Sequence, residues 1–269
     1  MKKLISFSLL AVVLTLGYTS CDKNDNFVPF FSVEDDKTLG AQVSQEINND
    51  PQYKILDRTQ YGTSYQYLQN IVDQILNSGE VAYKDEFVWE ITILEDDNTL
   101  NAFATPGGYI YVYTGLIKYL DNVDALAGVM GHEIAHADLR HTSRSLQKQY
   151  GVSVLLSLLV GENASQLEQI AAQIAGTAAG LQFSRAFETE SDIRSVEYLA
   201  QTPYACDGAK IFFQKLEAQG QGGSTPQFLS THPSPENRIQ DITDKAMEEG
   251  CDTTLTPNSG YAAFQQSLP

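Results

Sequence analysis

Three of the four histidines in the chain lie close together in one short segment, at His132, His136 and His141. His132 and His136 are four residues apart, so on a helix they share one face and can bind one metal ion from the same side. Glu133 points about 100° further round such a helix, where it can reach a water beside the metal. Two neutral nitrogen donors and a carboxylate base are the groups that metal-assisted hydrolysis needs.

The sequence around these residues predicts a half-buried helix. Asp121 or Asn122 can cap its start, and apolar residues follow at helical spacing. The apolar stripe comprises Val123, Leu126, Ala127, Met130, Ile134 and Ala137. Histidine and glutamate are costly to bury there without a partner, which a metal would provide. His-Glu-x-x-His is the ligand spacing of zinc peptidases; the alternative is a chance match, because the motif has two free positions.

Composition favours one globular domain. The chain has 269 residues, of which 42% are hydrophobic and 10% aromatic, enough for one sizeable core and without the signature of disorder. No break in composition divides residues 33–269, which we expect to form a single domain. The net charge of −17 makes nucleic acid an unfavourable partner.

The first 20 residues are typical of an export signal. Two lysines precede the apolar run Leu4–Leu16, which is shorter than the about 20 residues of a membrane span. The segment Leu16–Cys21 resembles a bacterial lipoprotein box, in which the cysteine becomes the lipidated N-terminus. We therefore expect a signal peptide over 1–20 and a tether over 21–32, with a plain secretory signal as the alternative. The lipid would anchor the protein in the bacterial cell envelope facing the periplasm, with the outer membrane favoured.

Export also bears on the remaining cysteines. With Cys21 lipidated, Cys206 and Cys251 remain. They are either two buried thiols or a disulfide, and an oxidising compartment favours the disulfide.

Apolar periodicity predicts a mostly helical chain with a few strands. Besides the metal-site helix, the predicted helices cover residues 33–47, 65–76, 143–159, 166–179, 187–199 and 207–218. A last helix should open at Ser234, with serine as its cap and Pro235 in its first turn. β-branched and aromatic residues predict strands over 87–94, 101–104 and 109–113. The last of these strands is expected to line a cleft and to bind an extended substrate by strand addition.

A catalytic zinc site needs a third protein ligand, and the segment Phe187–Asp192 offers one. Glu188 and Asp192 share a helix face, where like charges four residues apart repel by a few tenths of a kcal/mol. The placement makes sense if Glu188 binds the metal and Asp192 accepts a proton from the ring of a ligating histidine. The alternative is a solvated acidic face, which this stretch alone favours.

Four segments, in order along the chain, resemble the HtpX and CAAX prenyl protease family of zinc endopeptidases. They are Asn101–Val112, Gly131–His136 with Arg140–His141, Ser184–Asp192, and Thr231–Ile239. The resemblance implies that Glu188 is the third ligand of one zinc ion per chain. It also implies an α+β, predominantly helical, zincin-like domain with a small sheet beside the metal-site helix. Ser191 stands where the family usually has alanine, and the match is closest to periplasmic or lipid-anchored members.

We therefore predict a zinc metalloendopeptidase of the cell envelope that cleaves unfolded or misassembled proteins, with Glu133 taking a proton from the attacking water. His232 and Arg185 are candidates for stabilising the oxyanion, or have a purely structural role. His232 could instead fill the fourth zinc position and hold the enzyme latent. A chaperone-like zinc protein is an alternative function, against which the intact Glu133 argues. A lipoprotein with a structural zinc is another, against which three ligands rather than four argue.

Overall fold

The computed structural model describes residues 31–175, 182–218, 227–257 and 259–269. The predicted signal peptide, Cys21 and the tether up to residue 30 lie outside these ranges. So do the end of the helix predicted over 166–179 and most of the loop that precedes residue 227. Within the described residues, no helix is long and apolar enough to cross a membrane.

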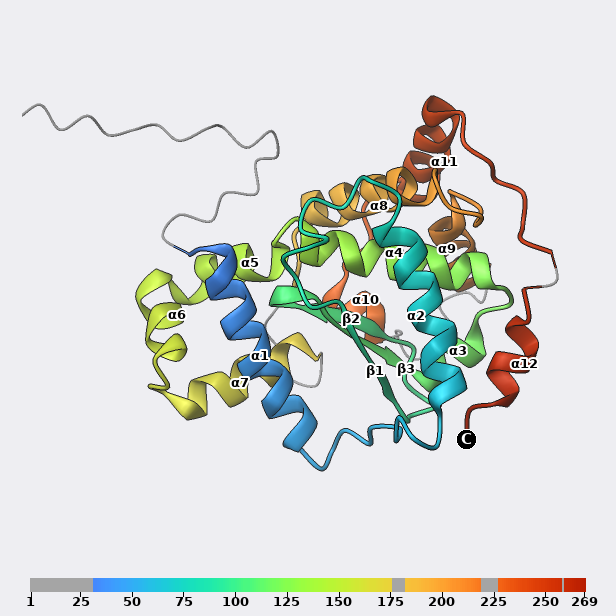
Figure 1. Cartoon of the computed structure of the whole chain (residues 1–269). Helices are drawn as coiled ribbons and strands as arrows, with labels where there is room; N and C mark the ends of the chain where they lie inside the picture. Colours follow the sequence, from blue (N-terminus) through green and yellow to red (C-terminus); the bar gives the residue numbers. More distant parts are fainter. Residues whose placement is uncertain (1–30, 176–181, 219–226, 258) are drawn as a thin grey trace, which may run out of the picture.

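A three-stranded sheet lies at the centre of the molecule (Figure 1). Its strands are β1 (Glu90–Leu94), β2 (Ala102–Thr105) and β3 (Tyr109–Tyr113), in the order β1-β3-β2. β3 pairs in parallel with β1 and antiparallel with β2, so both of its edges already carry hydrogen bonds. The prediction that residues 109–113 accept a substrate strand is therefore wrong: β3 is central, and β1 and β2 are the outer strands.

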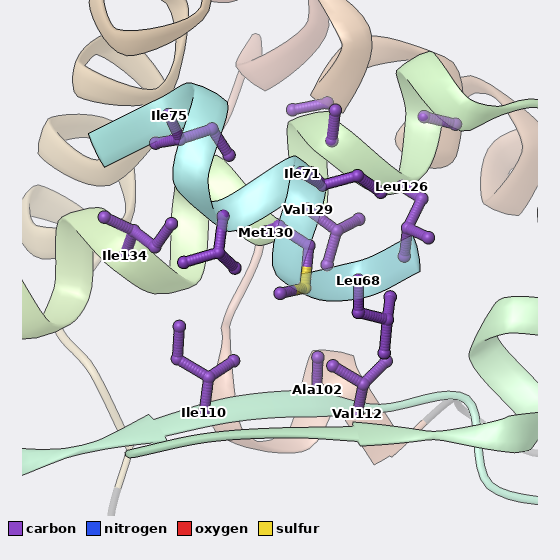
Figure 2. Packing of buried hydrophobic residues seen from close by; sticks show 14 of the residues in the cluster. Leu68, Ile71, Ile75, Ala102, Ile110, Val112, Leu126, Val129, Met130 and Ile134 are labelled. Carbon is purple, nitrogen blue, oxygen red and sulfur yellow. The ribbon is translucent and has the colours of Figure 1, made fainter. Parts of the chain in front are cut away.

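The helix predicted from the histidine motif is α4 (Val123–Asp138), and every one of its residues is buried. Of the two caps considered, Asn122 is used: its Oδ1 accepts a hydrogen bond of 2.8 Å from the Ala125 N–H. α4 packs against β2, α2 (Gly62–Leu76), α8 (Arg185–Leu199) and α9 (Gly208–Ala218). Figure 2 shows Met130 and Ile134 of α4 between side chains of α2 and of the sheet.

The alternation of side chains along β3 divides the core into two parts. Ile110 and Val112 belong to the cluster with α4 and α2, whereas Tyr111 and Tyr113 belong to a second cluster on the opposite face. That face is covered by α1 (Val33–Asn49) and the three helices after α4. They are α5 (His141–Tyr150), α6 (Val152–Leu159) and α7 (Ala164–Ile174). The tyrosine-rich strand thus fills the core.

Four further helices complete the described part of the chain. They are α3 (Thr114–Tyr119), α10 (Gln227–Thr231), α11 (Arg238–Glu249) and α12 (Tyr261–Gln266). A 3-10 turn, Pro106–Gly108, joins β2 to β3.

Several predicted boundaries differ from those observed. The helix predicted over 143–159 is two helices, α5 and α6, because Gly151 has a φ of 81° and interrupts the helical backbone. The strand predicted from residue 87 starts only at Glu90, because Trp89 has a φ of 47°. Ser234 is not a helix cap: its hydroxyl donates to the Pro235 carbonyl, and α11 starts after Asn237, whose φ is 67°.

Two links hold distant segments to this core. A disulfide joins Cys206, just before α9, to Cys251, just after α11. At the other end of α4, Arg140 forms a buried ion pair with Asp36 of α1. Its guanidinium also donates to the carbonyls of Phe31 and Ser32, at 2.6 and 2.9 Å. The first described residues are thus attached beside the end of the metal-site helix.

α4 and α9 cross at Gly128 and Gly208, which allows a testable prediction. A Cβ on Gly128 would lie 1.9 Å from the Ala209 nitrogen, so the backbones must separate to admit it. Gly128→Ala should therefore lower the free energy of unfolding by about 1–3 kcal/mol or more. Gly62→Ala is the matched control, because no atom lies within 4 Å of its added Cβ. Urea unfolding measures both, and equal midpoints for the two variants would contradict this account of the crossing.

Candidate active site

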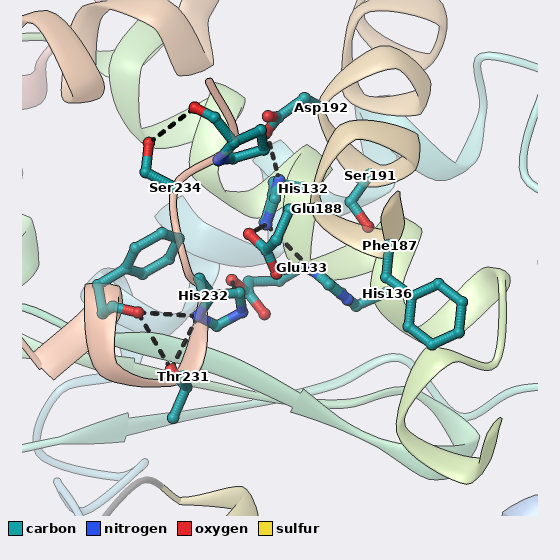
Figure 3. Close-up of polar contacts among 12 residues, drawn as sticks. His132, Glu133, His136, Phe187, Glu188, Ser191, Asp192, Thr231, His232 and Ser234 are labelled. Atoms are coloured by element: carbon teal, nitrogen blue, oxygen red, sulfur yellow. Dashed lines mark hydrogen bonds and ion pairs between the residues drawn. The ribbon is translucent and has the colours of Figure 1, made fainter. Parts of the chain in front are cut away.

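The crossing of α4 and α8 brings the predicted metal ligands together in the interior (Figure 3). His132 Nε2 lies 3.0 Å from His136 Nε2. The Glu188 carboxylate faces both rings, 3.5 Å from His132 Nε2 and 3.3 Å from His136 Nε2. Ser184 caps the start of α8: its hydroxyl accepts a hydrogen bond from the Phe187 N–H, and Glu188 lies in the first turn.

His232 completes the cluster from the segment after α10. One donor atom from each of His132, His136, Glu188 and His232 lies within 4.8 Å of the other three. His232 Nδ1 is 2.8 Å from Thr231 Oγ1 and 3.2 Å from the Phe228 carbonyl. Its Nε2 is therefore the atom that it presents to the cluster.

These residues fit a zinc ion. Among the described residues, the buried His232 Nε2 and Glu188 Oε1 have no hydrogen-bond partner. Buried polar atoms left in this way are costly, and a cation between them would satisfy both. Imidazole nitrogen and carboxylate oxygen are the donors that zinc prefers in such sites.

Burial controls the charge of the ligands. It lowers the pKa of His136 well below the usual value and that of His232 to about 4, so both rings are neutral at neutral pH. For His132 the burial effect is opposed by Asp192 and Glu188, which raise its pKa to about 9. Burial would raise the pKa of Glu188, but the surrounding imidazoles hold it well below its usual range. A metal ion would therefore meet an anionic carboxylate and would have to displace one proton, from His132.

Glu133 lies beside the cluster, as predicted, and is not one of the four donors. Its Oε1 is 3.5 Å from His232 Nε2. Burial raises its pKa to about 8, against the opposing effects of His132 and of a hydrogen bond with the Ala104 backbone of β2. A carboxyl group with a pKa near the working pH can both accept and return a proton.

Asp192 takes the position predicted for it, with Oδ1 2.9 Å from His132 Nδ1. A residue that the sequence analysis overlooked binds it from the other side. Arg238 is buried, and its Nε donates to Asp192 Oδ2 at 2.6 Å while Nη2 donates to Glu188 Oε2 at 2.7 Å. Its guanidinium also lies 3.8 Å from the centre of the Phe213 ring. The guanidinium of Arg238 offsets the repulsion expected between the carboxylates of Glu188 and Asp192. Two like charges on one helix face need a cationic partner, and this need was the only signal in the sequence that pointed to such a residue.

Arg185 lies elsewhere. Its side chain is 68% exposed and reaches Glu236, with 3.7 Å between Nη1 and Oε1. The structure therefore does not bring Arg185 to the metal cluster, and its position gives no support to the predicted oxyanion role. The guanidinium that reaches the buried carboxylates is that of Arg238.

Comparison with known proteins agrees with this geometry. Residues 63–246 match the sequence profile of Peptidase family M48. A mitochondrial metalloendopeptidase OMA1 from Schizosaccharomyces pombe is 27% identical over 212 residues, covering 78% of this chain and 61% of that protein. A putative beta-barrel assembly-enhancing protease from Vibrio cholerae is 33% identical over 164 residues, or 56% of this chain and 34% of that protein.

The beta-barrel assembly-enhancing protease of Escherichia coli is 32% identical over 163 residues, which cover 57% of this chain and 34% of that protein. The chain thus spans between about a third and about three fifths of the length of these relatives.

Proposed function

We propose that this chain, which belongs to peptidase family M48, is a zinc-dependent endopeptidase that cleaves unfolded or misassembled proteins of the bacterial cell envelope. The proposal rests on one observation: His132, His136 and Glu188 lie close together in the interior, and Glu133 lies beside them. The names of the relatives support the reaction class, since each is a protease or a metalloendopeptidase.

The residues divide the work of peptide hydrolysis between them. His132, His136 and Glu188 would hold the zinc ion. That ion, when bound, would polarise the scissile carbonyl and acidify a water molecule. Glu133 would take the proton as the water attacks the carbonyl carbon, and would return it to the nitrogen as the C–N bond breaks. Arg238 keeps the Glu188 carboxylate in place through its 2.7 Å hydrogen bond.

The burial of the site supports an extended substrate. His132, Glu133, His136, Glu188 and His232 are each at most 1% exposed. A folded surface could not reach atoms at that depth, whereas an unfolded segment or a loop is narrow enough to approach them. This favours unfolded or misassembled proteins as substrates.

A latent form is the second candidate, and the position of His232 favours it. Catalytic zinc sites keep one position open, whereas four protein donors are typical of closed sites. With His232 in the cluster, the described conformation offers four donors. A hydrogen bond of 3.2 Å from the Phe183 N–H to the Thr231 carbonyl ties the His232 segment to the start of α8. In this form the protein would bind unfolded segments with little proteolysis until His232 leaves.

The membrane attachment is part of the proposal. The first 21 residues support a lipoprotein of the cell envelope, because two lysines, an apolar run and a lipoprotein box follow one another up to Cys21. The protein would face the periplasm, and we favour the outer membrane over the inner one.

Substitution of the three acidic residues tests the mechanism. Glu133→Gln should bind zinc normally and lose about 10²–10⁴-fold in activity, because only the base is removed. Glu188→Gln should lose zinc affinity along with activity, with partial recovery in excess zinc. Asp192→Asn should weaken zinc binding by about 10–100-fold, through lost orientation of His132.

Zinc content by atomic spectroscopy and cleavage of an unfolded casein substrate measure all three variants. Glu197→Gln is the matched control, because it removes a carboxylate of α8 that pairs with Lys245 and lies outside the cluster. Wild-type turnover by Glu133→Gln would refute the mechanism, and unaltered zinc affinity in Glu188→Gln would refute that ligand.

His232→Ala tests the latent form. If His232 closes the site, the variant should keep stoichiometric zinc and cleave casein faster than the wild type. Slower cleavage with zinc retained would instead support a role in stabilising the oxyanion. Loss of zinc would make His232 an essential ligand, and unchanged kinetics would exclude both roles.

Cys21→Ser tests the anchor. The variant should accumulate as the precursor or appear in the soluble fraction, whereas the wild type should sediment with membranes. A wild-type protein that fractionates as soluble, with an unmodified N-terminus, would show that the lipid anchor is absent.

A further inference from the structure

The third of the four histidines, His141, has no role in the proposed chemistry, yet it is fully buried beside the site. Its Nδ1 lies 3.1 Å from His136 Nδ1, and its Nε2 lies 3.1 Å from Glu190 Oε2. Its ring is stacked on Phe187, with centroids 4.2 Å apart and planes 8° from parallel. A continuous row of polar atoms therefore runs from a proposed zinc ligand to Glu190, whose side chain is 41% exposed.

The hydrogen bonds in this row fix where the ring hydrogens lie. A carboxylate only accepts hydrogen bonds, and burial disfavours the charged form of the His141 ring, which is 0% exposed. The hydrogen of neutral His141 therefore lies on Nε2, which leaves a lone pair on Nδ1. His136 can then contribute only an N–H at its own Nδ1, so its Nε2 carries the lone pair that faces the cluster.

The neighbours of His141 are consistent with this order of donors and acceptors. Ser191 Oγ is 3.2 Å from His141 Nδ1, and a hydroxyl can donate to a lone pair there. His141 is the first residue of α5, and the preceding Arg140 is held by its ion pair with Asp36. The ion pair of Arg140 thus holds the backbone just before His141. Phe187 of α8 covers one face of the ring itself.

We propose that His141 and Glu190 are positioning residues for His136: they select the ring form in which His136 Nε2 is free to bind zinc. The arrangement parallels that of the other histidine ligand, which Asp192 contacts directly at 2.9 Å. Each histidine ligand thus has a carboxylate behind it, one in direct contact and one through a second imidazole. This proposal rests on the zinc site proposed above.

Two substitutions of His141 separate hydrogen bonding from packing. His141→Phe keeps an aromatic ring against Phe187 and removes the acceptor. His141→Asn loses the ring and keeps an acceptor, its Oδ1, near the place of Nδ1. Zinc affinity is measured by competition with a chelator, and thermal unfolding checks that each variant is folded.

His141→Phe should bind zinc about 10–100-fold more weakly than the wild type, the range for losing a group that orients a ligand. His141→Asn should stay much closer to the wild type. Glu190→Ala should weaken binding less than His141→Phe, and the control Glu197→Gln, on the same helix, should not change it. Wild-type affinity in His141→Phe, or an equal loss in His141→Phe and His141→Asn, would overturn the proposal.

A spectroscopic readout tests the ring form directly. The chain has only four histidines, so ¹⁵N-histidine labelling gives a small set of ring signals that single substitutions can assign. In the zinc-free wild type, His136 should show its hydrogen on Nδ1, and His141→Phe should shift it toward a mixture of the two forms. An unchanged His136 signal in His141→Phe would contradict the proposal. Failure of the wild type itself to bind zinc would refute the proposed function instead.

Discussion

The structure depends on one electrostatic constraint: several ionisable groups share an interior that water barely reaches. His132, His136, Glu188, Asp192 and His232 are all at most 1% exposed, and a charge buried without a partner costs several kcal/mol. Each group must therefore be satisfied by another group or by a metal. Arg238, His141 and the backbone around Phe228 contribute partners, and the metal would provide the rest. Removal of any one partner would leave a buried polar or charged group unsatisfied.

Helix packing is what makes this set possible. α4 is buried along its whole length, and the glycines at its crossing with α9 let the two backbones come into contact. The disulfide then holds the start of α9 to the end of α11, and α11 starts with Arg238, which reaches into the site. Residues far from the histidine motif in the sequence thus set the position of the cation that neutralises Glu188 and Asp192.

The parts of the site that the sequence predicted are those encoded by spacing within one helix. His132, Glu133 and His136 follow from the geometry of α4. The spacing of Glu188 and Asp192 places them on one face of α8, but it was the family resemblance that implied Glu188 as the third ligand. Contacts between elements were not predictable in this way. Arg238 was part of a recognised segment, but nothing local showed that it would face two carboxylates of α8. The central position of β3 depended on strand order, which a strand's own sequence does not encode.

The attachment of Phe31 and Ser32 to Arg140 has a mechanical consequence. Arg140 follows α4 by only two residues, and its guanidinium binds the carbonyls of Phe31 and Ser32, which precede α1. Through this one guanidinium, the start of α1 is linked to the end of the metal-site helix, so that a displacement of either is resisted by the other. His141 is the next residue, so the same linkage also restrains the backbone that carries the ring beside His136.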